Sequence, residues 1–480
     1  MNRALFLGVS VPLYAMLAAL SFRGVVLQGP ADVAAQSIFN HEYDYPLQWA
    51  YVGVGLALSV TWLWGIRHFS ALGLSGRGVL AVGALLGGLS LAAYPGVNSN
   101  DMMAYVGFGR IWAVHRLNPW THGFGDVIDW YAPYAWYPFA MPYGPVAGLF
   151  LVLAGYVSTV SVPLAFYFLK LCWLAAHLCA GWLVLRIARA NGLDGPRAAF
   201  TYLACPLILI EIVNNGHCDV LLVVLSLASL ERLMCTDTLR GASVAVVLGV
   251  LACLVKPTAV LLLLAEGAWL LRSGRGIALA WGALFACCAA GGLALTIFAS
   301  PEARAALTNP HILTNAHSFH SVLIHLRHAS YLTVYEGEGF KATRAMVSFL
   351  FALLCLWRAA CIRTRRDVVR EYLGMTLALM LFYSARVWPW YTSWLLPFAA
   401  VTDSRPLRRS MLLYCVSMFA VYALPFALLW QSLFWHAMRV LLSSGLPLML
   451  LAYGLLRRDT ATDEQASTSP SHDDSDPLYA

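Results

Sequence analysis

Long apolar runs separated by short polar segments make up most of this 480-residue chain, from Ala4 to Leu456. Roughly fifteen of these runs are long enough, or nearly long enough, to cross a bilayer as helices. The chain has none of the short alternating segments of a membrane β-barrel, and only helices and closed barrels satisfy all backbone hydrogen bonds in lipid. The pattern therefore predicts an all-α polytopic membrane protein with about 13–15 hydrophobic segments.

Two of the apolar runs leave their topology open. The run after Arg3 could be a cleaved signal peptide, but no clear small-x-small site ends it, so we expect a retained anchor. Segment 145–161 could span or stay on one side of the membrane. If both this segment and 163–185 span, the arginines that follow fall outside and every later loop inverts. We therefore favour a non-spanning or re-entrant 145–161, with a very short helix pair as the alternative.

Composition confirms the membrane class and separates a tail from the body. Hydrophobic residues are 60% of the chain and charged residues 11%, which excludes a water-soluble globule. The segment 458–480 holds six acidic residues, and from Asp459 onward it has no Lys or Arg. Its composition predicts a disordered cytoplasmic tail after a transmembrane domain at 1–457. The basic residues of that domain lie scattered in short loops, so nucleic acid is not an expected partner.

Loop charges predict the orientation. The basic loops, which we expect in the cytoplasm, are 67–77, 272–275, 358–370, 405–409 and 457–458. The segments then left for the outer face are 94–143, 211–219, Lys256, 301–340, 388–391 and 431–436. We expect a bacterial cytoplasmic (inner) membrane, with a first outer loop at 95–143 and a second at 300–340.

Asp101 stands out among the few polar residues on the predicted outer side. It lies next to Asn100 and one helical turn before Tyr105, with many aromatic residues downstream. One interpretation is an interfacial helix capped by Asp101 and anchored by an aromatic belt. The other is a carboxylate facing a sugar or polyprenyl chain, since aromatic rings offer flat apolar surfaces with polar rims. The residues alone leave both open.

Five segments, taken in order and spacing, carry a family resemblance. They read SNDMMAYVGFGRIWAVHRLNPWTHG, MPYGPVAGLFLVLA, NNGHCDVLLVVLSLASL, the pair Lys256-Pro257, and RVWPWYTSWLLPF. From about Tyr94 to Pro397, the chain resembles the polyprenol-phosphate-mannose-dependent α-1,6-mannosyltransferases of the C-type glycosyltransferase superfamily. The family usually has Arg-Asp at Asn100-Asp101 and Asn-Asp at Cys218-Asp219, two departures that bear on the donor sugar.

The resemblance implies the helical bundle of C-type glycosyltransferases with a large first catalytic outer loop. It implies that Asp101 is the catalytic base, acting outside the membrane with inversion at the anomeric carbon. A lipid phosphate is already a good leaving group, so the reaction needs a base and a positive charge but no general acid. The expected partners are a polyprenyl-phosphate sugar donor and a glycan or lipid acceptor. Asp126 and Asp129 match nothing in the family, so we interpret them as ordinary loop charges.

Lys256 and Arg386 are the candidates for the donor phosphate. Lys256 lies between two short apolar segments at a predicted membrane edge, and Arg386 at the outer end of a span. A lysine that merely extends to the membrane surface is the alternative for Lys256. The candidates for substrate binding are Asn100, Tyr105, Tyr143, His217, Asp219, Trp390 and Tyr391. For His217 and Asp219, a hydrogen-bonded turn is the simpler interpretation.

A metal site has little support in the sequence. The second outer loop holds His311, His317, His320, His325 and His328. No carboxylate or Cys joins them before Glu336, and spaced histidines without a further ligand type are weak evidence. We therefore expect no cofactor, although a divalent metal is conceivable.

A transporter, such as a lipid-linked-sugar flippase or other secondary carrier, is the competing function. It predicts internal repeats and charge placed in mid-span. The chain shows no such repeat, and its polar residues concentrate on one predicted side. This asymmetry favours an enzyme.

Overall fold

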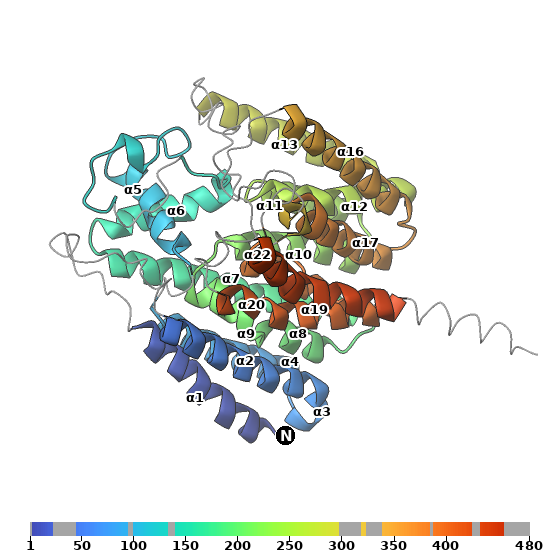
Figure 1. Cartoon of the computed structure of the whole chain (residues 1–480). Helices are drawn as coiled ribbons and strands as arrows, with labels where there is room; N and C mark the ends of the chain where they lie inside the picture. The colour runs from blue at the N-terminus through green and yellow to red at the C-terminus, as the bar shows by residue number, and fades with distance from the viewer. Residues whose placement is uncertain are drawn as a thin grey trace, which may run out of the picture.

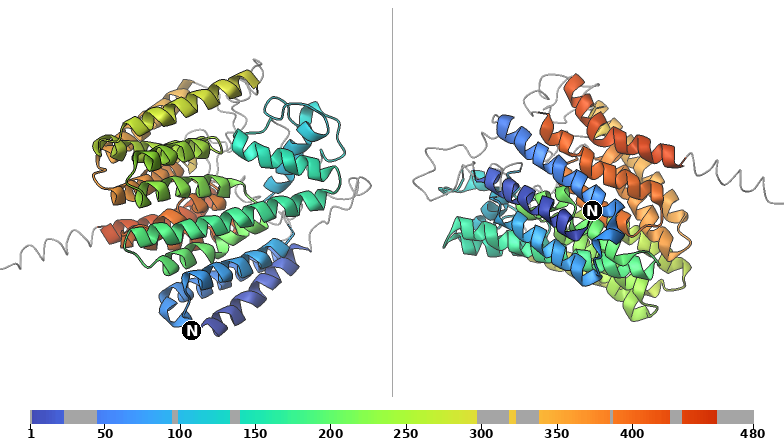
Figure 2. Two further views of the ribbon diagram at one scale, coloured as in Figure 1. Left: turned by 180° about the vertical axis from the view of Figure 1, so that it is seen from behind. Right: turned by 90° about the horizontal axis from the view of Figure 1, so that it is seen from below.

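The computed structural model describes residues 2–22, 45–94, 99–132, 140–296, 318–322, 338–384, 387–424 and 433–455. These ranges form helices joined by turns, with no strand among them. The all-α prediction is confirmed. Figure 1 shows most of the helices lying side by side in one bundle, and Figure 2 shows the N-terminal helices along one edge of it.

Four helices of the described residues are long and apolar enough to cross a membrane. They are α1 (Arg3–Ser21), α2 (Tyr45–Arg67), α7 (Val162–Ala190) and a helix over Phe434–Leu455 that begins with α22 (Leu433–Val440). A fifth candidate span is broken, because α8 (Gly195–Leu203) and the helix Pro206–Asn214 meet at 49°. The chain is therefore a multi-pass membrane protein.

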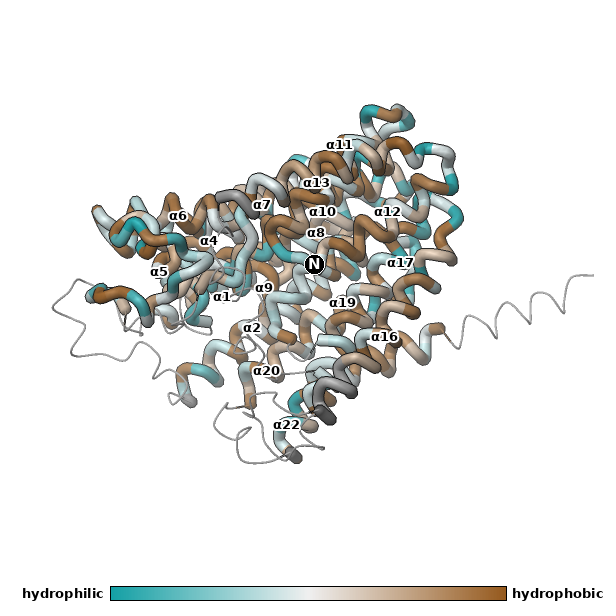
Figure 3. The backbone as a smooth tube through the Cα atoms, turned by 90° about the horizontal axis from the view of Figure 1, so that it is seen from above, coloured by the Kyte–Doolittle hydropathy of each residue, from teal (hydrophilic) through white to brown (hydrophobic). Residues whose placement is uncertain are grey.

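Many other helices are shorter than a comfortable span. They are α4 (Gly76–Ala92), α5 (Asp101–Ala113), α6 (Pro145–Ser158), α10 (Asp219–Cys235), α11 (Leu239–Cys253), α12 (Val260–Arg272), α17 (Arg365–Ala378) and α19 (Arg405–Ser417). The longer peripheral helices are α13 (Ile277–Thr296) and α16 (Glu338–Ala360). In Figure 3 hydrophobic residues run along the helices, while hydrophilic residues gather in turns beside α12 and α17. The apolar runs of the sequence are thus divided into short pieces rather than uniform spans.

The basic turns meet at one end of the bundle, which we call the arginine end. Arg186 of α7 pairs with Glu231 at 2.6 Å, and Arg275 and Arg365 both pair with Asp237. The end of α7 therefore shares this side with the other basic turns, as the favoured topology requires. The short α6 lies with α5 toward the opposite end of the bundle (Figure 1).

Two glycines let α5 and α6 cross in backbone contact. A Cβ added to Gly109 would lie 1.9 Å from the carbonyl oxygen of Leu151, and one added to Gly155 would lie 2.1 Å from the backbone of Gly109. No larger residue fits either position. This close crossing is typical of small residues in membrane helices, and it fixes the direction in which α5 presents its first residue, Asp101.

The structure of Asp129 differs from the prediction that it is an ordinary loop charge. It is 2% exposed and accepts two hydrogen bonds from Arg110 of α5, at 2.9 and 3.0 Å, with His115 Nε2 at 3.0 Å. Burial alone would raise the pKa of this carboxyl, but the Arg110 bonds hold it below its usual value. The interpretation as an ordinary loop charge is wrong, because this pair fastens the loop after α5 onto the helix. Asp126 instead closes a local turn by accepting from the backbone of Gly123 at 2.8 Å.

Candidate active site

Irregular backbone from four parts of the chain converges at the end opposite the arginine end. The parts are the start of α5, the π-helical turn η4 (Leu209–Asn214) with the loop after it, the break between α11 and η5 (Pro257–Ala259), and the 3-10 turn η8 (Pro389–Trp394). Prolines begin both 3-10 turns, because a proline at a first helical position needs no hydrogen-bond donor. Broken helices at membrane depth are typical of functional sites, since their free backbone groups must be satisfied locally.

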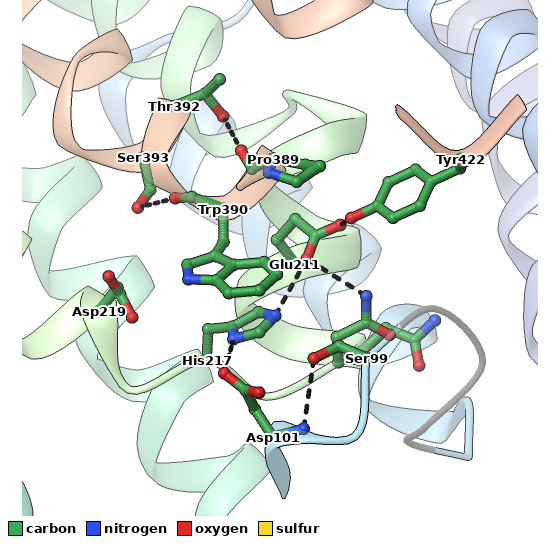
Figure 4. A network of polar contacts seen from close by, with 12 residues as sticks. Ser99, Asp101, Glu211, His217, Asp219, Pro389, Trp390, Thr392, Ser393 and Tyr422 are labelled. Carbon is green, nitrogen blue, oxygen red and sulfur yellow. Dashed lines mark hydrogen bonds and ion pairs between the residues drawn. The ribbon is translucent and has the colours of Figure 1, made fainter. Parts of the chain in front are cut away.

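His217 lies between two carboxylates in this region. Its Nδ1 is 3.3 Å from Asp101 Oδ2 and its Nε2 is 3.1 Å from Glu211 Oε2, as Figure 4 shows. Glu211 also accepts from Tyr422 and, at 3.3 Å, from Asn215. His217 and Glu211 are fully buried, whereas the Asp101 side chain is 16% exposed. Asp101 is therefore the member of this chain that faces outward.

The two carboxylates determine the charge of His217. Burial alone would lower the pKa of the imidazole, but Asp101 and Glu211 outweigh it and raise the pKa to about 9. His217 is thus an imidazolium at neutral pH, with both ring nitrogens as donors. Trp390 stacks on its ring at 3.8 Å between centroids, with 16° between the planes (Figure 4). The aromatic face adds a cation–π contact and holds the imidazolium in place.

Lys256 and Asp219 form a second ion pair beside the first group, in which Asp219 is fully buried and the Lys256 side chain is 17% exposed. Lys256 Nζ lies 2.7 Å from Asp219 Oδ1, and Trp394 Nε1 donates to the same oxygen at 2.8 Å. The lysine ammonium is also 5.3–5.4 Å from the ring centres of Tyr143, Tyr391 and Trp394. Burial would lower the pKa of Lys256, but the Asp219 charge raises it above its usual value.

Tyr105 and Tyr143 connect the two charged groups. Their rings pack edge to face with centroids 5.2 Å apart, and the Tyr105 hydroxyl accepts from the backbone of Cys218 at 3.5 Å. Cys218 lies between His217 and Asp219, so one short loop supplies both the imidazolium and the carboxylate that binds Lys256. The arrangement brings a partly exposed base, a partly exposed cation and an aromatic wall into one place.

Comparison with known proteins identifies the family of this chain. The family described as Alpha-(1->6)-mannopyranosyltransferase, N-terminal domain, matches residues 5–272, just over half of the chain. The chain belongs to this family. It is also 29% identical, over 438 residues, to Alpha-(1->6)-mannopyranosyltransferase A of Mycobacterium tuberculosis, covering 82% of this chain and 81% of that protein. The protein is therefore a glycosyltransferase, and the prediction of an enzyme rather than a flippase is confirmed.

The structure of this glycosyltransferase assembles most of the predicted site residues. Those brought together are Asp101, Tyr105, Tyr143, His217, Asp219, Lys256, Trp390 and Tyr391. Asn100 is the N-cap residue of α5 but makes no side-chain capping bond. Asp101 is not the helix cap of the simpler interpretation, because its carboxylate faces His217. Arg386 lies outside the described residues, so its role stays a prediction.

Three residues of the candidate site escaped the sequence analysis: Glu211, Trp394 and Tyr422. Glu211 could have been singled out, because a lone charge within the apolar run LILIEIV is costly in a membrane and is kept for a reason. Tyr422 carries no such signal. Its hydroxyl donates a hydrogen bond to Glu211, but the two residues are 211 positions apart in the sequence, so no local pattern indicates this contact.

The predicted metal alternative gains no support from the described part of the chain. In that part, no three His, Cys, Asp or Glu side chains are placed to hold a metal ion. His320 Nδ1 instead lies 2.7 Å from the carbonyl oxygen of Tyr383. His311, His317, His325 and His328 lie outside the described residues, so the absence of a cofactor stays an expectation.

Proposed function

We propose that this glycosyltransferase moves mannose from a polyprenyl-phosphate donor to a glycan or lipid acceptor, with inversion of the anomeric centre. The observation that carries the proposal is the line Asp101–His217–Glu211, in which only the terminal carboxylate is partly exposed. The mannosyltransferase activity in the name of the mycobacterial relative supports mannose as the sugar. The motif order shared with enzymes that use polyprenol phosphate supports the donor class.

Asp101 acts as the base in this proposal. Its Oδ2 faces His217, which leaves Oδ1 to accept the proton of the acceptor hydroxyl. The acceptor oxygen attacks the anomeric carbon, the bond from that carbon to the phosphate oxygen breaks, and the electron pair leaves with the phosphate. His217 holds the carboxylate in orientation, and Glu211 compensates the charge of the imidazolium. One carboxylate suffices because the leaving group needs no proton.

The phosphate requires more positive charge than Lys256 supplies alone. The described site holds three carboxylates, Asp101, Glu211 and Asp219, against two cations, His217 and Lys256. A donor phosphate would add further negative charge, and the positive charge of Lys256 is already balanced by the carboxylate of Asp219. We therefore propose that Lys256 contacts the phosphate while still paired, and that Arg386 supplies the additional charge.

We infer the membrane side from the separation of the site and the arginine end. Basic turns face the cytoplasm in most membrane proteins, which would place the site on the periplasmic or outer face of a bacterial cytoplasmic membrane. A polyprenyl chain could then lie in the bilayer while its phosphate reaches the buried cations. This orientation also fits an acceptor in the cell envelope.

The test is transfer by the purified protein from a panel of polyprenyl-phosphate sugars to a labelled mannoside acceptor. We expect mannose to be preferred and Asp101→Asn to lower the rate by roughly 10²- to 10⁴-fold, the usual contribution of a positioned base. Asp126→Asn is the matched control and should keep nearly full activity. Normal turnover by Asp101→Asn would overturn the mechanism, and preference for another sugar would overturn the choice of mannose.

A further inference from the structure

A second place suited to a ligand lies at the arginine end, far from the proposed transfer site. It is a cavity of about 500 Å³ between the first turn of α19 and the last turns of the span Phe434–Leu455. Its lining residues are Asp403, Arg405, Pro406, Arg409, Leu450, Tyr453 and Gly454. Mannosyl transfer makes no use of these residues.

Positive charge concentrates on one wall of this cavity. Arg405 and Arg409 are four positions apart on α19, so they lie on one face of the helix, and both are exposed. No described carboxylate lies within ion-pair distance of either guanidinium. Arg197 and Arg408 are close enough to act electrostatically on the same region, against the single acidic group of Asp403.

The start of α19 adds to this positive field. Ser404 is its N-cap residue but makes no side-chain capping bond to the first turn. Apart from Pro406, which has no N–H, the first-turn backbone donors and the helix dipole therefore favour an anion at this end of α19. Together with the two arginines, they provide several donors around one open volume.

The facing wall is apolar and continues onto the lipid-exposed surface. Gly454 packs so closely on Pro406 that an added Cβ would lie 2.9 Å from the proline Cβ, which brings the two helices together beside the cavity. Leu446, Met449 and Leu455 of the same span are exposed, in line with a surface covered by acyl chains. A cationic pocket next to an apolar surface at a membrane boundary has the two features that a phospholipid requires.

We propose that this cavity binds the headgroup of an anionic phospholipid, with its phosphate on Arg405 and Arg409 and its acyl chains along the exposed face of the span Phe434–Leu455. Guanidinium groups suit phosphate because they donate two hydrogen bonds at once. The excess of arginine over Asp403 disfavours a zwitterionic lipid, whose positive headgroup would meet like charge. The acidic tail at 458–480 is the other candidate occupant, but it offers no acyl chain for the apolar wall.

The test is native mass spectrometry of the full-length protein in detergent, titrated with phosphatidylglycerol or with phosphatidylcholine of the same acyl chains. We expect phosphatidylglycerol to bind at least about tenfold more tightly, the factor that one good charge-assisted contact supplies. Arg405→Ala with Arg409→Ala should abolish this preference. Arg405→Lys with Arg409→Lys should keep part of it, since the charge remains but the paired donors are lost.

Control variants distinguish lipid binding in the cavity from general attraction of anionic lipid to positive charge at the protein surface. Arg363 and Arg366 are exposed at the same end but line no such cavity, so alanine at both should leave the preference unchanged. Thermal unfolding in phosphatidylcholine alone should be the same for all these variants, which excludes misfolding. Equal loss in the Arg363 and Arg366 variant would overturn the proposal, as would equal affinity of the wild type for both lipids.

Two further measurements distinguish the other occupants. Inorganic phosphate at millimolar concentration should not displace phosphatidylglycerol, because it lacks the apolar contacts; full displacement would indicate a site for free anions. Neutralising the tail acids, Asp459, Asp463, Glu464, Asp473, Asp474 and Asp476, to their amides should not change lipid binding. If only the neutralised protein binds phosphatidylglycerol, the tail is the occupant and the proposal fails.

Discussion

At the end of the bundle where α5 begins, Glu211, His217 and Asp219 lie buried together, whereas at the opposite end buried pairs such as Arg186–Glu231 are joined by pairs in open turns. Glu211, His217 and Asp219 are inaccessible to solvent, while the side chain of Asp237 is 76% exposed between Arg275 and Arg365. Pairs of acidic and basic residues therefore differ between the two ends in how strongly they interact. Water screens the exposed pairs, but buried pairs must compensate each other, so each buried charge constrains its neighbours.

The largest expected difference between the two ends concerns stability. Asp129→Asn leaves Arg110 buried beside a neutral group, and breaking such a pair should cost about 3 kcal/mol of unfolding free energy. Asp237→Asn, at the arginine end, should leave the Tm unchanged because water solvates its partners. Thermal unfolding in detergent of both variants checks this comparison. Equal Tm values would show that burial of the Arg110 pair contributes nothing to stability.

Removing one cation from the site should lower catalytic efficiency rather than stability alone. One charge-assisted contact in a low-dielectric site contributes about 1.5–3 kcal/mol, so Lys256→Ala should reduce kcat/KM roughly tenfold to hundredfold. Lys256→Arg should retain part of the activity, and Arg275→Ala at the other end should retain all of it. Kinetics and donor titration in detergent measure both effects. Unchanged donor affinity and rate in Lys256→Ala would leave the lysine without a role in binding the phosphate.

The pH dependence of stability should reveal the charge of His217. Its pKa is about 9 in the folded protein against 6.5 for an ordinary histidine. Because the folded pKa is the higher one, this stabilisation is complete below about pH 6.5 and is lost as pH rises through about 9. The Tm should therefore fall over this interval, and Glu211→Gln should flatten the decline by removing one of the two carboxylates. A wild-type Tm that rises across the same range contradicts a protonated His217.

The smallest perturbation tests which way the two ends face. Ile128, in the loop that follows α5, is fully exposed, and Arg363 lies exposed at the arginine end. In a background without the native cysteines, Ile128→Cys should react with an impermeant thiol reagent added to intact cells, and Arg363→Cys only after permeabilisation. Labelling in the reverse order would place the site in the cytoplasm and overturn the outer-face assignment. Asn98 and Thr314, which the sequence suggested as further outer positions, lie outside the described residues.

The sequence was enough for the class of protein and for naming most of the residues that the structure brings together in the candidate site. Apolar runs of span length require helices, because lipid offers no partner to an unpaired backbone group. Asp101, His217, Asp219, Lys256 and Trp390 could be named in advance because each belongs to a short motif whose order along the chain is readable. Charge and aromatic residues beside apolar runs mark such positions, since they are costly in a membrane.

Only the tertiary structure decided how those residues pair and therefore what charge each one carries. Trp394 and Asp219 are 175 positions apart in the sequence, and Lys256 and Asp219 are 37 positions apart. Neither pairing has a local pattern, because each depends on how separate broken helices pack. The importance of Asp129 was hidden for the same reason: its partner Arg110 is 19 positions away, on α5. A linear sequence lists the charged groups of this enzyme, but their protonation and strength depend on burial and distance, which arise only when the helices come together.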